Sequence, residues 1–208
     1  MKSLPLAARV YVTAVIAVGA VLLVVFFPTQ FFGNPFLFLG LLLLSSITSV
    51  FKVNLPLARR SSTMSVSYAA DFAALLLLGP NETMIVAAAS AFSQCTFRIK
   101  ERNPIHRTLF SMACLIVTVQ AAGLVYRWMG GEVGVIPGLG IAKPLIGAAT
   151  AYFVFNTYTV ATAIALSMKQ PLLKVWYQNF LWSAPSYFVG ATVAALVSWG
   201  SGLQSQWV

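Results

Sequence analysis

Long apolar runs with few charged residues follow one another along almost the whole chain. Several of them reach the roughly 20 residues that a helix needs to cross the hydrocarbon core of a bilayer. Only 8% of the 208 residues are charged, whereas a soluble domain carries about 25%. The runs do not alternate as the strands of a membrane β-barrel would. The sequence therefore predicts an all-α, polytopic transmembrane helical bundle that forms a single integral membrane domain over residues 1–208.

About seven hydrophobic elements can be placed in this bundle. Two of them, 64–78 and 83–97, form a short hairpin around the turn 79–82, and each is shorter than a bilayer core requires. This pair is either two spans across a thin membrane or a re-entrant pair buried in the bundle. The other predicted spans cover about 10–27, 36–51, 108–126, 144–168 and 179–199.

The first span carries small residues at a spacing that favours close packing of helices. Ala7, Ala14, Ala17 and Ala20 form a loosely aligned face on this helix. Small side chains let the backbones of membrane helices approach each other. We therefore expect this alanine face to contact another helix.

Positive charge is distributed unevenly between the two sides that alternating spans define. Eleven of the 13 Lys and Arg fall at the N-terminus and in the predicted loops 52–64, 98–107 and 169–178. The opposite side has only Arg127 and Lys143. Because basic loops stay on the cytoplasmic side of a membrane, this distribution predicts a multi-pass protein with a cytoplasmic N-terminus.

Acidic residues and histidine are too few for conventional catalysis. The chain holds four Asp and Glu and one His, and it lacks the motifs of zinc proteases, serine hydrolases and P-loop enzymes. His106 has no second His, Cys or acidic residue at a metal-ligand spacing. We therefore expect no catalytic residue, no metal site and no cofactor. The net charge of +9 fits basic loops rather than a face that binds nucleic acid.

Asp71 is the one acidic residue inside an apolar run. A charge at the centre of a membrane helix costs about 2.5–3.5 kcal/mol on insertion scales, so such a residue normally faces the bundle interior and has a partner. Tyr68 and Ser67 lie three and four residues before it, on the same face of a helix. Asp71 is thus a candidate ligand, ion or proton site. The alternative is a carboxyl group that holds helices together through hydrogen bonds.

Polar side chains also interrupt the later spans. Asn156 and Thr157 follow Tyr152 by about one turn, and Gln120 lies in the preceding span. Such groups either line a ligand site or join helices, each hydrogen bond contributing about 1–2 kcal/mol or less. Tyr187 begins the last span, where an interfacial aromatic belt is commoner than an aromatic pocket. The candidate ligand-binding residues are therefore Asp71, Tyr68, Ser67, Asn156, Thr157 and Gln120.

The string KVNLPLARRSSTMSVSYAADFAALLLLGPNETMIVAAASAFSQC resembles the N-terminal multi-span sensor regions of bacterial signalling proteins that carry HD-GYP or GGDEF domains. The matching parts are 63–67, the Leu-rich arm ending at Gly-Pro and the small-residue arm after it, while 152–157 and 175–183 also fit. The resemblance implies a sensory, ligand-binding input module of the bacterial inner membrane that serves cyclic-dinucleotide signalling. It also implies one further span after the chain, which would return the polypeptide to a cytoplasmic output domain.

A weaker similarity leads to a different function. A short apolar arm, a Gly-Pro turn and a small-residue arm are also similar to the substrate-binding components of energy-coupling-factor vitamin transporters. That similarity implies a transporter subunit or small carrier in which Asp71 binds substrate or a proton. For either function the expected partners are membrane lipids and a small or lipophilic ligand, with a homodimer as a further expectation and no nucleic acid.

Overall fold

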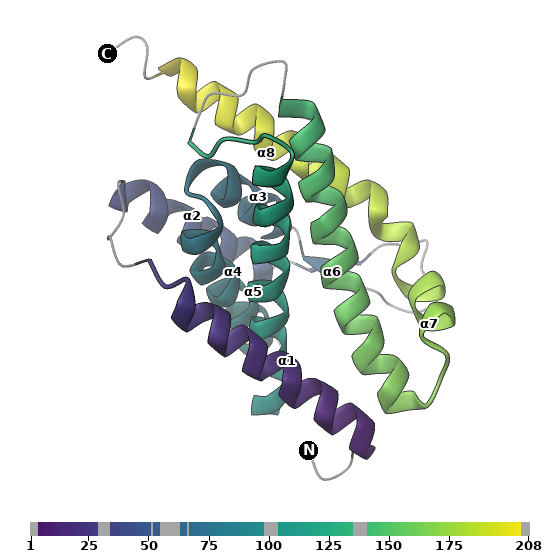
Figure 1. The fold of residues 1–208 in the computed structure, drawn as a ribbon. Coiled ribbons are helices and arrows are strands. Elements are labelled where there is room, and N and C mark those ends of the chain that lie inside the picture. Colours follow the sequence, from purple (N-terminus) through teal and green to yellow (C-terminus); the bar gives the residue numbers. More distant parts are fainter. Residues whose placement is uncertain are drawn as a thin grey trace.

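A computed structural model of the chain describes residues 4–28, 34–50, 52–54, 63–65, 67–97, 104–134 and 141–204. These residues form a bundle of α-helices with one small two-stranded ribbon, which confirms the predicted all-α polytopic class (Figure 1). The helices are α1 (Leu6–Val25), α2 (Pro35–Val50), α3 (Ser67–Leu77), α4 (Pro80–Thr96), α5 (Ile105–Trp128), α6 (Ala142–Met168), α7 (Leu172–Asn179) and α8 (Ala184–Gln204), with a 3-10 turn, η2 (Leu181–Ser183), before α8.

Four helical stretches among the described residues are long and apolar enough to cross a membrane. They are Leu6–Val25, Ile105–Trp128, Ala142–Met168 and Leu172–Val197, the last of which joins α7 to most of α8. The helix α3 is much shorter: its 11 residues extend about 16 Å, roughly half of a hydrocarbon core. Eight of these residues are buried. This arm of the hairpin is therefore short and packed inside the bundle.

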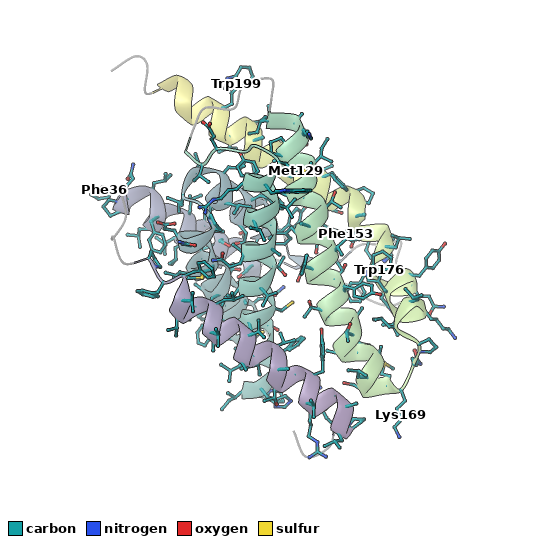
Figure 2. All side chains as sticks on the ribbon, in the orientation of Figure 1. Phe36, Met129, Phe153, Lys169, Trp176 and Trp199 are labelled. Carbon is teal, nitrogen blue, oxygen red and sulfur yellow. The ribbon has the colours of Figure 1, made fainter. Side chains whose placement is uncertain are left out.

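The helix α5 lies at the centre of the bundle, where it contacts α1, α3, α4 and α6. The helix α2 packs on α3 and α4, and α8 packs on α3 and α6. The N-terminus and the corner between α6 and α7 lie at one end of the bundle, and the C-terminus lies at the other (Figure 1). Met129 and Lys169 likewise lie at opposite ends (Figure 2). The helix α6 thus runs opposite to α5 and to the stretch formed by α7 and α8, as the distribution of positive charge requires.

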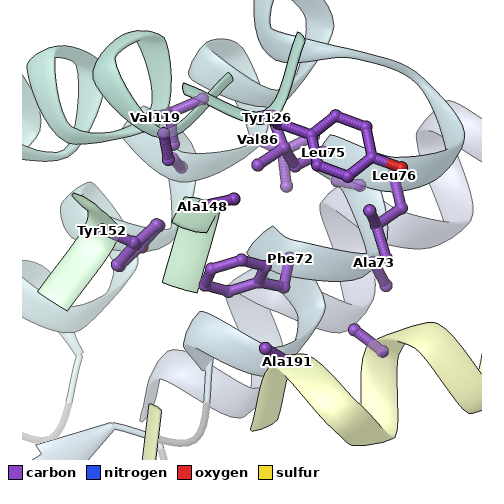
Figure 3. Close-up of a cluster of buried hydrophobic side chains, with 14 of the residues drawn as sticks. Phe72, Ala73, Leu75, Leu76, Val86, Val119, Tyr126, Ala148, Tyr152 and Ala191 are labelled. Carbon is purple, nitrogen blue, oxygen red and sulfur yellow. The ribbon is translucent and has the colours of Figure 1, made fainter. Parts of the chain in front are cut away.

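The core is built around α3. Phe72 is fully buried at the centre of the cluster, near Ala148 of α6 and Ala191 of α8 (Figure 3). A glycine lets α5 approach the start of α4 closely. A Cβ at Gly123 of α5 would lie only 2.5 Å from Cβ of Pro80, the first residue of α4. In a membrane, helix association depends on this close van der Waals packing because lipid is as apolar as the side chains.

The helix α1 contacts the bundle through a face different from the predicted one. Its buried residues are Ala8, Val12 and Gly19. A Cβ at Gly19 would lie 2.6 Å from Cβ of Ala113, so the helices α1 and α5 cross at this point. The prediction was wrong because alanine suits lipid contact as well as protein contact, whereas the closest approach needs a glycine. The four alanines predicted to pack are all exposed: Ala7, Ala14, Ala17 and Ala20.

The predicted basic loop 169–178 is mostly helical. The helix α6 ends at Met168, and Lys169 follows with a left-handed φ of 53°. Pro171 then precedes α7 directly. Proline suits a helix start because the first N–H groups of a helix have no partner inside it. The segment therefore turns once and forms a short helix along α6.

The predicted loop 52–64 begins and ends in a short ribbon. The strands β1 (Lys52–Asn54) and β2 (Thr63–Ser65) pair antiparallel, with Val53 opposite Met64. The predicted arm 64–78 was therefore wrong at its start, because its first residues pair as a strand and the helix begins at Ser67. Much of the basic-loop evidence lies outside the described residues, including Arg59, Arg60, Arg98, Lys100 and Arg102.

Candidate functional site

Asp71 lies in the second turn of α3 and is 1% exposed. The Ser45 hydroxyl of α2 donates a 2.7 Å hydrogen bond to Oδ1 of Asp71. The Tyr152 hydroxyl of α6 donates a 3.1 Å hydrogen bond to Oδ2. Each carboxyl oxygen thus accepts a hydrogen bond from another helix, which is how a buried carboxyl group is tolerated. The two contacts connect α2, α3 and α6 through one side chain.

Small residues let the carboxyl group reach both partners. Ser45 is fully buried and directly follows a run of leucines. Its hydroxyl faces Asp71 of α3, where the larger side chain of a leucine would occupy the space. Ala70 and Ala74 of α3 are also buried, at 6% and 0% exposure. These short side chains keep α3 close to its neighbours along the same stretch as Asp71.

A second polar contact joins α6 to α8. Nδ2 of Asn156 donates a 2.9 Å hydrogen bond to the Tyr187 hydroxyl. Asn156 follows Tyr152 by four residues, so both side chains lie on one face of α6. Sγ of Cys114, on α5, lies 3.7 Å from Oδ1 of Asn156. The face of α6 that bears these residues therefore meets α3, α5 and α8.

Three tyrosine rings stand around these polar groups. The Tyr68 and Tyr187 ring centroids are 5.0 Å apart, and those of Tyr152 and Tyr187 are 6.0 Å apart. The Tyr68 hydroxyl donates a hydrogen bond to the carbonyl oxygen of Ser186. Gly190 makes room for this arrangement, since a Cβ there would lie 2.0 Å from the Tyr68 ring. Tyrosine and glycine together therefore fix the contact between α3 and α8.

A cavity of about 270 Å³ lies among these groups. Its walls come from α3, α4, α5, α6 and α8 and from the turn that holds η2. Ser67 begins α3, Gln94 lies near the end of α4 and Ser111 lies in the second turn of α5, and all three line the cavity. The cavity is therefore nearer to the end of the bundle at which α3 and α5 begin.

The helix α7 is attached to the cavity wall. Nε1 of Trp176 donates a 2.9 Å hydrogen bond to Oγ1 of Thr157, which itself donates to the Phe153 carbonyl oxygen. The Trp176 ring lies 6.0 Å from the Phe153 ring, and both residues lie side by side along α6 and α7 (Figure 2). Because Thr157 lines the cavity, a shift of α7 would reach the cavity through this contact.

The structure places five of the six candidate residues together and one apart. Gln120 is the exception: its Nε2 lies 3.4 Å from the Pro80 carbonyl oxygen and 3.4 Å from Oδ1 of Asn81. It therefore contacts the start of α4, at the turn of the hairpin. A ligand role for any of the six residues stays a prediction. The five that line the cavity are Asp71, Tyr68, Ser67, Asn156 and Thr157.

Several residues of this site were not among the predicted candidates, including Tyr152, which donates to Asp71. Ser45 is the donor closest to Asp71, and its signal was a serine directly after a run of leucines. Tyr187, assigned by the sequence to an interfacial belt, is 5% exposed and lines the cavity. Cys114 is buried in the cavity wall and carried no signal of its own. Within the described residues, no three His, Cys, Asp or Glu side chains gather as metal ligands.

The sequence profile of the MASE9 family matches residues 20–199, a stretch that extends from α1 to α8. The chain belongs to the MASE9 family. MASE9 domains are membrane-associated sensor domains that typically lie N-terminal to GGDEF or HD-GYP signalling domains. No curated protein and no solved structure matches the chain at a significant level.

Membership of MASE9 confirms the resemblance to multi-span sensor regions. The domain is a multi-pass, membrane-associated input module without a catalytic role of its own. The alternative similarity to vitamin-transporter components receives no support from the match. The cavity just described is therefore the cavity of a MASE9 sensor domain.

Proposed function

We propose that this MASE9 domain binds a small molecule in the Asp71 cavity and passes the binding event to a cyclic-dinucleotide signalling domain at the bacterial inner membrane. The observation that carries the proposal is that Asp71 lines the cavity and also accepts hydrogen bonds from two other helices. A ligand that contacts this carboxyl group binds the same side chain that the Ser45 and Tyr152 hydroxyls hold in place. Ligand binding and helix packing are therefore coupled through one side chain.

The coupling gives the domain two states that a ligand can distinguish. A ligand shifts such an equilibrium only by the difference between its affinities for the two states. Two tyrosines of the cavity wall supply the difference in ligand affinity between the two states. Tyr187 belongs to α8, and Tyr68 contacts α8 through Ser186. Since MASE9 domains typically precede their signalling domains, α8 is the helix that leads toward the output.

The cavity faces the half of the bundle that the charge distribution assigns to the cytoplasm. Lys169 and the start of α5 lie at that end (Figures 1 and 2). Basic residues near a membrane favour the cytoplasmic side. We therefore expect the ligand to arrive from the cytoplasm or from the cytoplasmic leaflet.

A cavity-filling variant tests the sensor proposal. Ala91 is 1% exposed and lines the cavity from α4, so Ala91→Phe occupies the space that a ligand needs. Ala14→Phe adds the same side chain on the exposed face of α1 and serves as the matched control. Both are introduced into the whole gene product, and cellular cyclic-dinucleotide levels are measured across growth conditions. Membrane insertion is checked by immunoblotting, and Asp71→Asn provides a second variant of nearly unchanged volume.

We expect Ala91→Phe and Asp71→Asn to hold the cyclic-dinucleotide level constant across conditions that change it in the wild type. Ala14→Phe should respond as the wild type does. If both cavity variants insert normally and still follow the wild-type response, the cavity is a packing feature and the proposal fails.

A further inference from the structure

We infer that the Asp71 cavity selects a small organic cation, such as a protonated amine on a short aromatic or aliphatic body. The inference rests on the proposed function, in which this cavity binds the ligand. It is carried by the charge, the hydrogen-bonding polarity and the aromatic character of the cavity wall. Each of these points to the same class of molecule.

The charge of the wall has one sign. Asp71 lines the cavity, and no described lining residue is Lys, Arg or His. A buried carboxylate requires either hydrogen bonds with a compensating charge or a change of its protonation state. A ligand cation supplies the compensating charge, whereas a ligand anion would meet repulsion in a medium of low dielectric constant.

Four hydroxyl groups of the wall already donate their protons to the protein. Tyr152 donates to Asp71, and Thr157 and Ser183 donate to carbonyl oxygens of their own segments at 2.6 Å each. Tyr68 donates to Ser186. A hydroxyl that donates to the protein retains lone pairs for a ligand. These positions therefore present acceptors to the cavity, and an ammonium group with several N–H donors matches them.

Aromatic faces complete the match. The Tyr68, Tyr152 and Tyr187 rings all line the cavity, with centroids 5.0 and 6.0 Å apart in the two pairs that include Tyr187. Cations are attracted to the faces of such rings when they lie within about 6 Å of the centroid. A cavity that combines a carboxylate with tyrosine rings thus attracts positive charge from more than one side.

The volume limits the size of the ligand. Dry cavities of about 150 Å³ bind benzene, so a cavity of about 270 Å³ accommodates on the order of ten non-hydrogen atoms. Three compounds of this size differ only in their polar group: 2-phenylethylamine, which is a cation at pH 7, neutral 2-phenylethanol, and the anion phenylacetate. They form a matched set of probes for the charge preference of the cavity.

Binding of these three probes is measured by calorimetry on the full chain in lipid nanodiscs. Empty nanodiscs and the Ala91→Phe variant correct for partitioning into lipid. We expect 2-phenylethylamine to bind at least tenfold more tightly than 2-phenylethanol, and phenylacetate not to bind. In Asp71→Asn, the affinity for the amine should fall to that for the alcohol, while the affinity for the alcohol changes less than threefold.

Equal affinity for the amine and the alcohol, or preference for phenylacetate, overturns the cation inference but leaves a cavity that binds small molecules. Absence of binding by all three probes also overturns it, whereas the sensor proposal is decided separately by the cellular response of Ala91→Phe. Because the preference is measured on the wild type first, the result stands even if Asp71→Asn does not fold.

Discussion

Ser45 and Asp71 lie 26 residues apart in the chain, yet the Ser45 hydroxyl donates a 2.7 Å hydrogen bond to Oδ1 of Asp71 in the interior of the protein. The same carboxyl group accepts a hydrogen bond from Tyr152 and lines the cavity. One side chain therefore contributes both to helix packing and to the ligand site. Two sites that share a group in this way are coupled, and the coupling is reciprocal.

Removing either donor should destabilise the bundle. In Ser45→Ala and Tyr152→Phe, one oxygen of the buried Asp71 carboxyl group loses its partner, and we expect the free energy of unfolding to fall by about 1–3 kcal/mol in each case. Thr192→Ala is the control, because the exposed Thr192 hydroxyl donates only within α8, to the Phe188 carbonyl oxygen. Reversible unfolding in mixed detergent micelles measures the difference. Wild-type stability in both donor variants would show that these hydrogen bonds do not hold the helices together.

Gly190 should tolerate no larger residue. A Cβ at this position would lie 2.0 Å from the Tyr68 ring, so Gly190→Ala must displace Tyr68 or separate α3 from α8. We expect a destabilisation of about 1–3 kcal/mol, as for other overpacked sites. Gly40→Ala is the matched control on α2, where nothing lies within 4 Å of the added Cβ. There the unfolding free energy should stay unchanged or rise by about 0.5–1 kcal/mol, because alanine favours a helix over glycine.

The contact between Trp176 and Thr157 should control the exposure of α7. Trp176→Phe removes the 2.9 Å hydrogen bond to Thr157 and keeps an aromatic ring against Phe153. Loss of about 1 kcal/mol corresponds to several-fold faster opening, so amide hydrogen exchange in 172–179 should accelerate by roughly five- to tenfold. Trp128→Phe is the control, because Trp128 is 83% exposed at the end of α5. Identical exchange in the two variants would contradict this prediction.

The two ends of α6 should lie on opposite sides of the membrane. Met129 and Lys169 lie at opposite ends of the bundle, and the basic loops predict that the end with Lys169 is cytoplasmic (Figure 2). Alkaline phosphatase, which is active only outside the cytoplasm, should therefore be active when fused after Gly131 and inactive when fused after Lys169. The reverse pattern would refute the cytoplasmic N-terminus. Equal activity at both positions would show that α6 does not cross the membrane.

The membrane class and the approximate position of most helices follow from the sequence alone. A hydrocarbon core requires about 20 apolar residues and satisfies no backbone hydrogen bond, so each span must be a helix of known minimum length. Asp71 stands out for the same local reason, because a carboxyl group is costly in that environment. Four further candidates follow from the sequence because each lies on the same helix face as another polar residue or next to one in the same span. These are Tyr68, Ser67, Asn156 and Thr157.

Only the tertiary structure decided which face of each helix meets another helix. In lipid, a side chain that contacts protein and one that contacts lipid are equally apolar, so the sequence carries little amphipathic signal. For that reason the sequence did not show that Ala14 is exposed while Gly19 marks the crossing of α1 and α5. Nor did it show that Gln120 contacts the start of α4, or that Ser45 donates to Asp71. Residues far apart in the chain form the cavity, and their meeting depends on how α2, α3, α6 and α8 pack together.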